Sequence, residues 1–141
     1  MSGRSETDGP EATERAGAEL AATLEPGDVV LVSGDLGAGK TTFVRGALRA
    51  LGVTKPVTSP TFVVGHAFEG RDGPLAHLDL YRLGGMDGED PGLLDPFFAP
   101  GTIAFVEWPE HAEGAWPRGS VAAHVRLGHA GGDRRTLEVE R

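Results

Sequence analysis

The chain of 141 residues contains no cysteine, asparagine or glutamine, and its only lysines are Lys40 and Lys55. The absence of cysteine excludes disulfides, thiolate metal sites and cysteine nucleophiles. No apolar run approaches the roughly 18 residues that a transmembrane helix requires. The first ten residues also lack the apolar core of a signal peptide. We therefore expect a cytoplasmic protein with no membrane contact.

Positive charge is scarce as well, because 13 basic residues stand against 21 acidic ones and give a net charge of −8. Such a chain is not expected to hold RNA or DNA on a broad basic face. Any nucleic acid that it serves is expected to be held by a partner. Hydrophobic residues make up 39% of the chain, which is typical of a folded domain.

Apolar spacing predicts one domain over residues 11–141, preceded by a disordered tail at residues 1–10 whose residues are small, polar and turn-forming. The first half is expected to alternate between helices and a buried strand, and the second half to consist of strands and loops. The predicted helices are 11–24 and 39–51, the predicted strands are 29–32, 61–64, 75–80 and 102–106, and the predicted C-terminal hairpin pairs 120–127 with 135–140.

The strongest signal is the segment from Gly34 to Thr41, GDLGAGKT, which fits the phosphate-binding pattern G-x-x-x-x-G-K-[ST]. Glycines at these positions let successive backbone N–H groups turn inward around a polyphosphate. The loop also opens a helix, whose N-terminal amides favour an anion. In this pattern Lys40 would contact the β- and γ-phosphates, and the Thr41 hydroxyl would bind Mg²⁺.

A phosphate-binding loop also needs a carboxylate at the end of a neighbouring strand, and the sequence offers Glu107 and Asp79. Glu107 directly follows a fully apolar run, whereas Asp79 ends a less uniform strand. His77 alternates with Asp79, so the two side chains share one face of a strand and permit a His–Asp pair. Thr61, within Ser59-Pro60-Thr61, is a candidate switch residue that senses the γ-phosphate.

Other nucleotide-hydrolysing classes are excluded by what the chain lacks. Guanine-specific GTPases read the base with Asn-Lys-x-Asp and often orient water with glutamine, and this chain has neither residue type. The protein-kinase motifs His-Arg-Asp and Asp-Phe-Gly are also missing. Adenine is therefore favoured as the base.

Four segments together resemble the TsaE (YjeE) family, the ATPase component of the bacterial machinery that makes threonylcarbamoyladenosine in tRNA. The order and spacing of these segments match over residues 12–140, and their combination is far more specific than the phosphate loop alone. The four segments are GDLGAGKTTF with Arg45-Gly46, VTSPTF from Val57, HLDLYRL from His77 and VEWP from Val106.

The resemblance implies a P-loop NTPase-like three-layer α/β domain with a mixed, mostly parallel sheet and a C-terminal β-hairpin. It implies that Thr41 and Glu107 hold Mg²⁺ and that Asp79 serves hydrolysis, so that Lys40, Asp79 and Glu107 form the catalytic set. The adenine is expected near Glu11 to Thr13 and near Gly132 to Arg134. The residues implied to bind ATP are Gly37, Ala38, Gly39, Lys40, Thr41, Thr42, Thr61, Glu11, Thr13 and Arg134.

The resemblance further implies that the chain acts with a TsaB–TsaD heterodimer as a weak, partner-stimulated ATPase that touches tRNA only indirectly. Two rival functions remain open: a small-molecule kinase on the same fold, and a non-catalytic nucleotide-dependent binding module. The chain departs from the family where His66 and Phe68 replace a frequent acid and tyrosine, and Glu89-Asp90 matches the family's acidic stretch only roughly.

Overall fold

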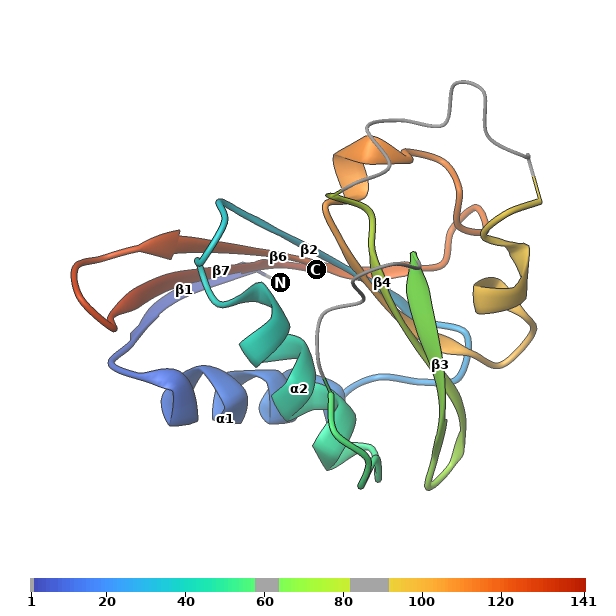
Figure 1. The fold of residues 1–141 in the computed structure, drawn as a ribbon, viewed down its shortest axis with the longest axis horizontal. Coiled ribbons are helices and arrows are strands. Elements are labelled where there is room, and N and C mark those ends of the chain that lie inside the picture. The colour runs from blue at the N-terminus through green and yellow to red at the C-terminus, as the bar shows by residue number, and fades with distance from the viewer. Residues whose placement is uncertain (1, 58–63, 82–91) are drawn as a thin grey trace.

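A seven-stranded mixed sheet forms the centre of the computed structural model, which describes residues 2–57, 64–81 and 92–141 (Figure 1). The strand order is β1-β7-β6-β2-β5-β4-β3. The four central strands β6, β2, β5 and β4 are parallel to one another, while the pairs β1–β7, β7–β6 and β4–β3 are antiparallel. The strands are β1 (Ser2–Thr7), β2 (Val29–Gly34), β3 (Gly65–Gly70), β4 (Gly73–Asp79), β5 (Ile103–Glu107), β6 (Val121–His129) and β7 (Arg135–Glu140).

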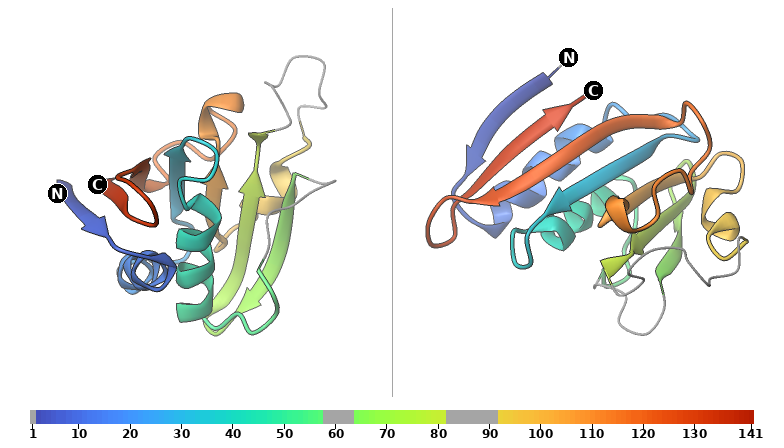
Figure 2. Two further views of the ribbon diagram at one scale, coloured as in Figure 1. Left: turned by 60° about the vertical axis from the view of Figure 1, so that its left-hand side comes forward. Right: turned by 90° about the horizontal axis from the view of Figure 1, so that it is seen from above.

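Two α-helices, α1 (Pro10–Ala21) and α2 (Lys40–Ala50), pack side by side on one face of this sheet (Figure 2). The opposite face is covered by the connecting segments and two short 3₁₀ turns, η2 (Asp95–Phe98) and η3 (Pro109–His111). Because both faces are covered, every residue of β5 is buried. The predicted mixed α/β sheet with a C-terminal hairpin is confirmed.

The strand alternation decides which side chains meet the helices. On β5, Phe105 packs into the core beneath the helices, whereas its neighbours Ala104 and Val106 face the 3₁₀ turns. Glu107 lies two residues beyond Phe105 and therefore projects to the helix side at the carboxyl end of the strand. On β4, Ala76 and Leu78 face the 3₁₀ turns, so the intervening His77 also projects to the helix side.

The first residues differ from the predicted disordered tail. Ser2–Thr7 form the edge strand β1, which pairs with β7 along its length, from Ser2 opposite Glu140 to Thr7 opposite Arg135. Thr7 is also anchored to helix α1, because its hydroxyl lies 2.7 Å from that of Thr13. The segment has no apolar pattern that would predict a strand. Its hydrogen-bond partners come from β7, the edge of the C-terminal hairpin that would otherwise be unpaired.

Both strands of the hairpin β3–β4 differ in their bounds from the predicted strands: β3 lies later in the chain than residues 61–64, and β4 begins at Gly73 rather than at residue 75. The expected strand 61–64 falls on residues of which only Val64 is described, and Val64 precedes β3 rather than belonging to it. The turn between β3 and β4 consists of Arg71 and Asp72, because Glu69 pairs with Pro74 and Gly70 with Gly73. Gly73 has a φ of 141°, and this freedom allows the tight reversal. Among the described residues, no helix is long and apolar enough to cross a membrane.

Candidate nucleotide site

The glycine-rich loop connects the end of β2 to the start of α2. Gly34, Gly37 and Gly39 take positive φ values of 149°, 76° and 97°, which side-chain-bearing residues rarely adopt. The loop thereby turns its backbone inward, and its last glycine caps the N-terminus of α2. This is the strand–loop–helix context in which the sequence motif binds phosphate.

Lys40 is the first residue of α2, and its side chain folds back over the loop. Its Nζ donates to the carbonyl oxygens of Gly34 and Asp35, each at 2.8 Å, and only 5% of the residue is exposed. Burial lowers the pKa of Lys40, while the nearby carboxylates, Glu107 first among them, oppose that shift. The ammonium group therefore lies at the loop, where carbonyl groups satisfy its N–H donors without neutralising its charge.

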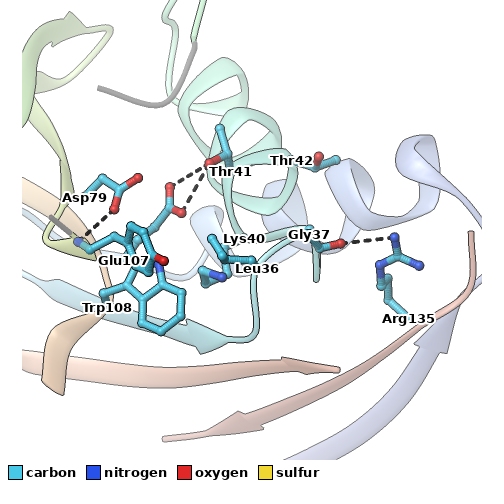
Figure 3. A pocket seen from close by; sticks show the side chains of 11 residues that line it. Leu36, Gly37, Lys40, Thr41, Thr42, Asp79, Glu107, Trp108 and Arg135 are labelled. Atoms are coloured by element: carbon cyan, nitrogen blue, oxygen red, sulfur yellow. Dashed lines mark hydrogen bonds between the residues drawn. The ribbon is translucent and has the colours of Figure 1, made fainter. Parts of the chain in front are cut away.

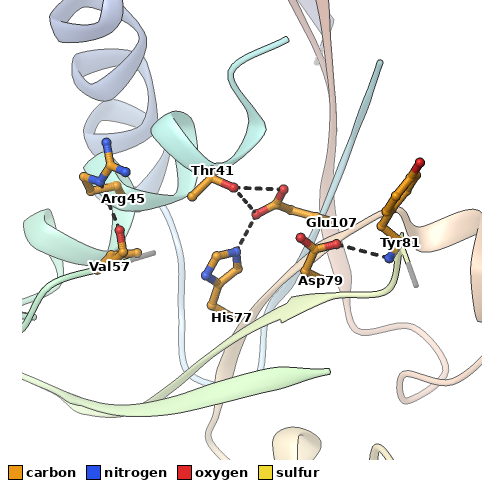
Figure 4. A network of polar contacts seen from close by, with 7 residues as sticks. All are labelled: Thr41, Arg45, Val57, His77, Asp79, Tyr81 and Glu107. Atoms are coloured by element: carbon orange, nitrogen blue, oxygen red, sulfur yellow. Dashed lines mark hydrogen bonds and ion pairs between the residues drawn. The ribbon is translucent and has the colours of Figure 1, made fainter. Parts of the chain in front are cut away.

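Glu107 is the acidic group at the centre of the site (Figure 4). Its carboxylate accepts a hydrogen bond from the Thr41 hydroxyl, at 2.9 Å to Oε2 and 3.2 Å to Oε1. It also accepts the Nε2–H of His77 at 2.5 Å. Glu107 is 2% exposed and His77 is fully buried, so water does not screen these contacts.

The His–Asp pair that the alternation of His77 and Asp79 permitted does not form. His77 reaches across to Glu107 on the adjacent strand, and its Nδ1 has no hydrogen-bond partner. Asp79 instead accepts the backbone N–H of Tyr81 at 3.1 Å. Its pKa is raised, chiefly because burial disfavours the carboxylate and secondly because Glu107 is close, although the bond from Tyr81 opposes the rise.

Trp108 closes the site from the side of β5. Its φ is 58°, and no other described residue with a side chain has a positive φ. This backbone places its ring over Lys40, with Nζ 4.5 Å from the ring centroid, as expected for a cation–π contact. Tyr81 packs against the same ring at 4.8 Å between centroids. A strained residue beside a buried charged cluster is typical of a functional site.

Most of these groups line an open cavity of about 300 Å³ (Figure 3). The structure thus brings together seven residues that the sequence predicted for the site, and Ala38 is buried within the same loop. Leu36, Tyr81, Trp108 and Arg135 also border the cavity. The seven predicted residues in the lining are Gly37, Gly39, Lys40, Thr41, Thr42, Asp79 and Glu107.

A second, smaller cavity of about 50 Å³ adjoins the first beside the start of α1 and the turn between β6 and β7. Thr13, one of the residues expected near the adenine, lines it. Glu11 and Arg134 line neither cavity, and the Arg134 side chain instead donates to the carbonyl of Ala130 at 2.9 Å. The lining consists of Gly9, Pro10, Thr13, Gly39, Thr42, Asp133 and Arg135.

Arg135 borders both cavities, yet the sequence did not identify it as a site residue. The pairing of β6 with both β2 and β7 places its side chain at the phosphate loop, so no local pattern could reveal it. Thr61, the predicted switch residue, lies outside the described residues, as do Ser59 and the Glu89-Asp90 stretch.

The oxygen donors of Thr41 and Glu107 fit Mg²⁺, which prefers hard oxygen ligands and retains several waters and phosphate oxygens of its own. The two residues already lie in contact at the end of the loop. Among the described residues, no group of three or more metal-binding side chains occurs.

Comparisons with known proteins point to one family. Residues 7–137 match the family model described as "Threonylcarbamoyl adenosine biosynthesis protein TsaE". The chain is 38% identical to the tRNA threonylcarbamoyladenosine biosynthesis protein TsaE of Bacillus subtilis, over 91% of this chain and 78% of that protein. It is 48% identical to the Streptomyces coelicolor protein of the same name, over 67% and 65%. The crystal structure of Bacillus subtilis YdiB superposes with a TM-score of 0.75 at 33% identity, covering 99% of this chain and 84% of that one.

Proposed function

The chain belongs to the TsaE family, and from this premise we propose that it is a Mg²⁺-dependent ATPase subunit for threonylcarbamoyladenosine formation in tRNA. One observation carries the proposal most directly. The Thr41 hydroxyl and the Glu107 carboxylate meet beneath a glycine-rich loop whose lysine is buried. This arrangement supplies both a cradle for phosphates and oxygen ligands for their metal ion.

Different residues of the chain have different roles in hydrolysis. The loop amides and Lys40 bind the β- and γ-phosphates and stabilise the charge that develops as the terminal phosphoryl group leaves. Thr41 and Glu107 hold Mg²⁺, which when bound neutralises charge on the phosphate oxygens. His77 fixes the orientation of the Glu107 carboxylate through its Nε2–H.

Asp79 orients the attacking water in this proposal. It borders the cavity and lies opposite Glu107 in the register between β4 and β5. Only one bond from Tyr81 to its Oδ1 engages the carboxylate among the described residues, so the group retains acceptor capacity for water. Its raised pKa also makes it a stronger base than an exposed aspartate.

The proposed partners are a TsaB–TsaD pair, with tRNA reached only through them. The net charge of −8 supports indirect contact with tRNA, because a chain with so few basic residues makes a poor electrostatic surface for phosphate backbones. Hydrolysis is expected to be slow for the chain alone and faster when the pair is present.

The decisive experiment measures phosphate release from Mg-ATP by the chain alone and with the TsaB–TsaD pair, for wild type, Lys40→Ala and Asp79→Asn. We expect stimulation by the pair, weakened ATP binding in Lys40→Ala, and a loss of hydrolysis of about 100-fold or more in Asp79→Asn with binding retained. Unchanged binding and hydrolysis in Lys40→Ala would contradict the mechanism. Transfer of phosphate to a small acceptor instead of water would indicate a kinase.

A further inference from the structure

We propose that Arg135, on the C-terminal hairpin, is a nucleotide-binding residue that contacts the phosphate chain at the end nearer the nucleoside. This inference rests on the proposed function and adds a second cation to the one that the loop motif provides. Arg135 borders both the cavity above the phosphate loop and the smaller cavity beside α1. A nucleotide that occupied both cavities would lie next to the Arg135 guanidinium.

The Arg135 side chain lies directly against the phosphate loop. Its Nη2 donates to the carbonyl oxygen of Gly37 at 3.1 Å, as Figure 3 shows. Its Cγ lies 3.9 Å from where a Cβ on Gly39 would stand. The hairpin is held at the loop by a second contact, in which His129 Nε2 lies 3.4 Å from the carbonyl oxygen of Leu36.

Within the described part of the chain, the charge of Arg135 has no acidic partner. Its other bonds go from Nη1 to the carbonyl oxygens of Gly132 at 2.7 Å and Arg134 at 2.9 Å. Among the described residues no carboxylate forms an ion pair with it, whereas Arg45 pairs with Glu14 and Arg126 with Glu140. Carbonyl oxygens satisfy N–H donors but leave the positive charge available to an anion.

The geometry of guanidinium suits phosphate better than it suits single carbonyls. Its planar fork can donate two parallel N–H bonds to one phosphate group, and such charge-assisted bonds are about twice as strong as neutral ones. Arg135, Lys40 and the N-terminus of α2 then surround one cavity with three sources of positive potential. Binding of the phosphate chain would replace carbonyl partners of Arg135 with anionic oxygens.

The test measures the affinity of wild type and Arg135→Gln for Mg-ADP and Mg-ATP by calorimetry at several salt concentrations. We expect Arg135→Gln to bind both nucleotides about tenfold more weakly. We also expect its affinity to depend less on salt, because one charge–charge contact is lost. A merely structural role for Arg135 would leave the salt dependence unchanged and would overturn the inference.

Matched variants separate the possible outcomes. Arg126→Gln removes the same charge from the same hairpin but away from both cavities, so it should bind as wild type. Arg135→Lys keeps the charge without the fork, so it should restore the salt dependence and recover only part of the affinity. If Arg135→Gln fails to fold, Arg135→Lys still tests the inference.

A larger loss in Arg134→Gln than in Arg135→Gln would overturn the assignment. Normal binding by Arg135→Gln alongside weakened binding by Lys40→Ala would refute this inference and leave the proposed function standing, whereas absence of nucleotide binding in wild type would refute the proposed function itself.

Discussion

The nucleotide site and the contact between α1 and α2 lie on the same face of the sheet but use opposite chemistry. The site buries Lys40, His77 and Glu107, three groups that lose hydration when they leave water. The helix pair buries almost no side chain at its closest points, because Gly17 and Gly46 let the two backbones touch. A Cβ on Gly46 would lie 2.0 Å from the carbonyl oxygen of Glu14, and one on Gly17 would lie 2.1 Å from that of Phe43.

This difference indicates where stability and function reside. The helix pair supplies close packing, in which even one methyl group is too large, and it positions the start of α2 against the sheet. The site supplies buried polar groups that are held in fixed orientations for a ligand, and a buried pair of this kind adds little net stability compared with apolar packing. We therefore expect changes in the helix pair to alter stability, and changes in the site to alter binding and hydrolysis.

The largest effect should follow from Gly46→Ala. Alanine favours a helix over glycine by up to about 1 kcal/mol, but its methyl group would overlap the Glu14 backbone of α1. We expect the free energy of unfolding to fall by about 2–3 kcal/mol, measured by urea denaturation. Gly3→Ala is the control, because nothing lies within 4 Å of a Cβ there. Equal stability of the two variants would show that the helices can separate without cost.

A smaller effect on function is expected at His77. His77→Leu removes the donor to Glu107, and we expect the Mg²⁺ concentration for half-maximal hydrolysis to rise about tenfold. The Mg²⁺ dependence of ADP binding, measured by calorimetry, should shift in the same direction. His77→Gln retains an N–H donor and should recover part of the difference. If both variants lose stability but keep the Mg²⁺ dependence of wild type, His77 is a core residue and not a positioning residue.

The smallest effect concerns His124, which lies outside the site and contacts the Ser33 hydroxyl at 2.8 Å. Burial, and secondly the charge of Arg126, lowers the pKa of His124 from its ordinary value of 6.5. The unfolded chain therefore binds this proton at a higher pH than the folded chain does. Its contribution to stability is complete above about pH 6.5 and declines as the pH falls below that value.

The experiment compares urea denaturation of wild type and His124→Gln at pH 7.5 and pH 5.5. We expect wild type to lose slightly more stability than the variant between these values, by a fraction of a kcal/mol, since solvent screens this half-buried group. The difference between the two proteins isolates His124 from other titrating groups. A steeper loss in the variant would reverse the assigned sign.

The predictions that succeeded rest on local patterns. The runs at 29–32 and 102–106 became buried parallel strands, and the predicted helix 39–51 became α2, whose buried side includes Val44 and Leu48. The phosphate loop was evident because glycine spacing, lysine and threonine occur together in one short segment. These features depend on residues near one another in the chain, so periodicity and motif spacing identify them.

The predictions that failed depend on partners far away in sequence. Ser2–Thr7 form a strand because β7 offers an unpaired edge, and no feature of the segment itself indicates this. His77 pairs with Glu107 rather than Asp79 because β4 lies beside β5. Alternation correctly placed His77 and Asp79 on one face, but it could not tell which neighbour would come within hydrogen-bond distance.

The sequence by itself determined the phosphate loop, the strand before it, the helix after it and the acidic residue that ends β5. Each of these follows from backbone freedom, apolar periodicity or charge within a few residues of chain. The tertiary structure alone decided that His77 supports Glu107, that Trp108 covers Lys40 and that Arg135 meets the phosphate loop. Those contacts join strands and loops about 30 to 100 residues apart, and only the order of strands in the sheet brings them together.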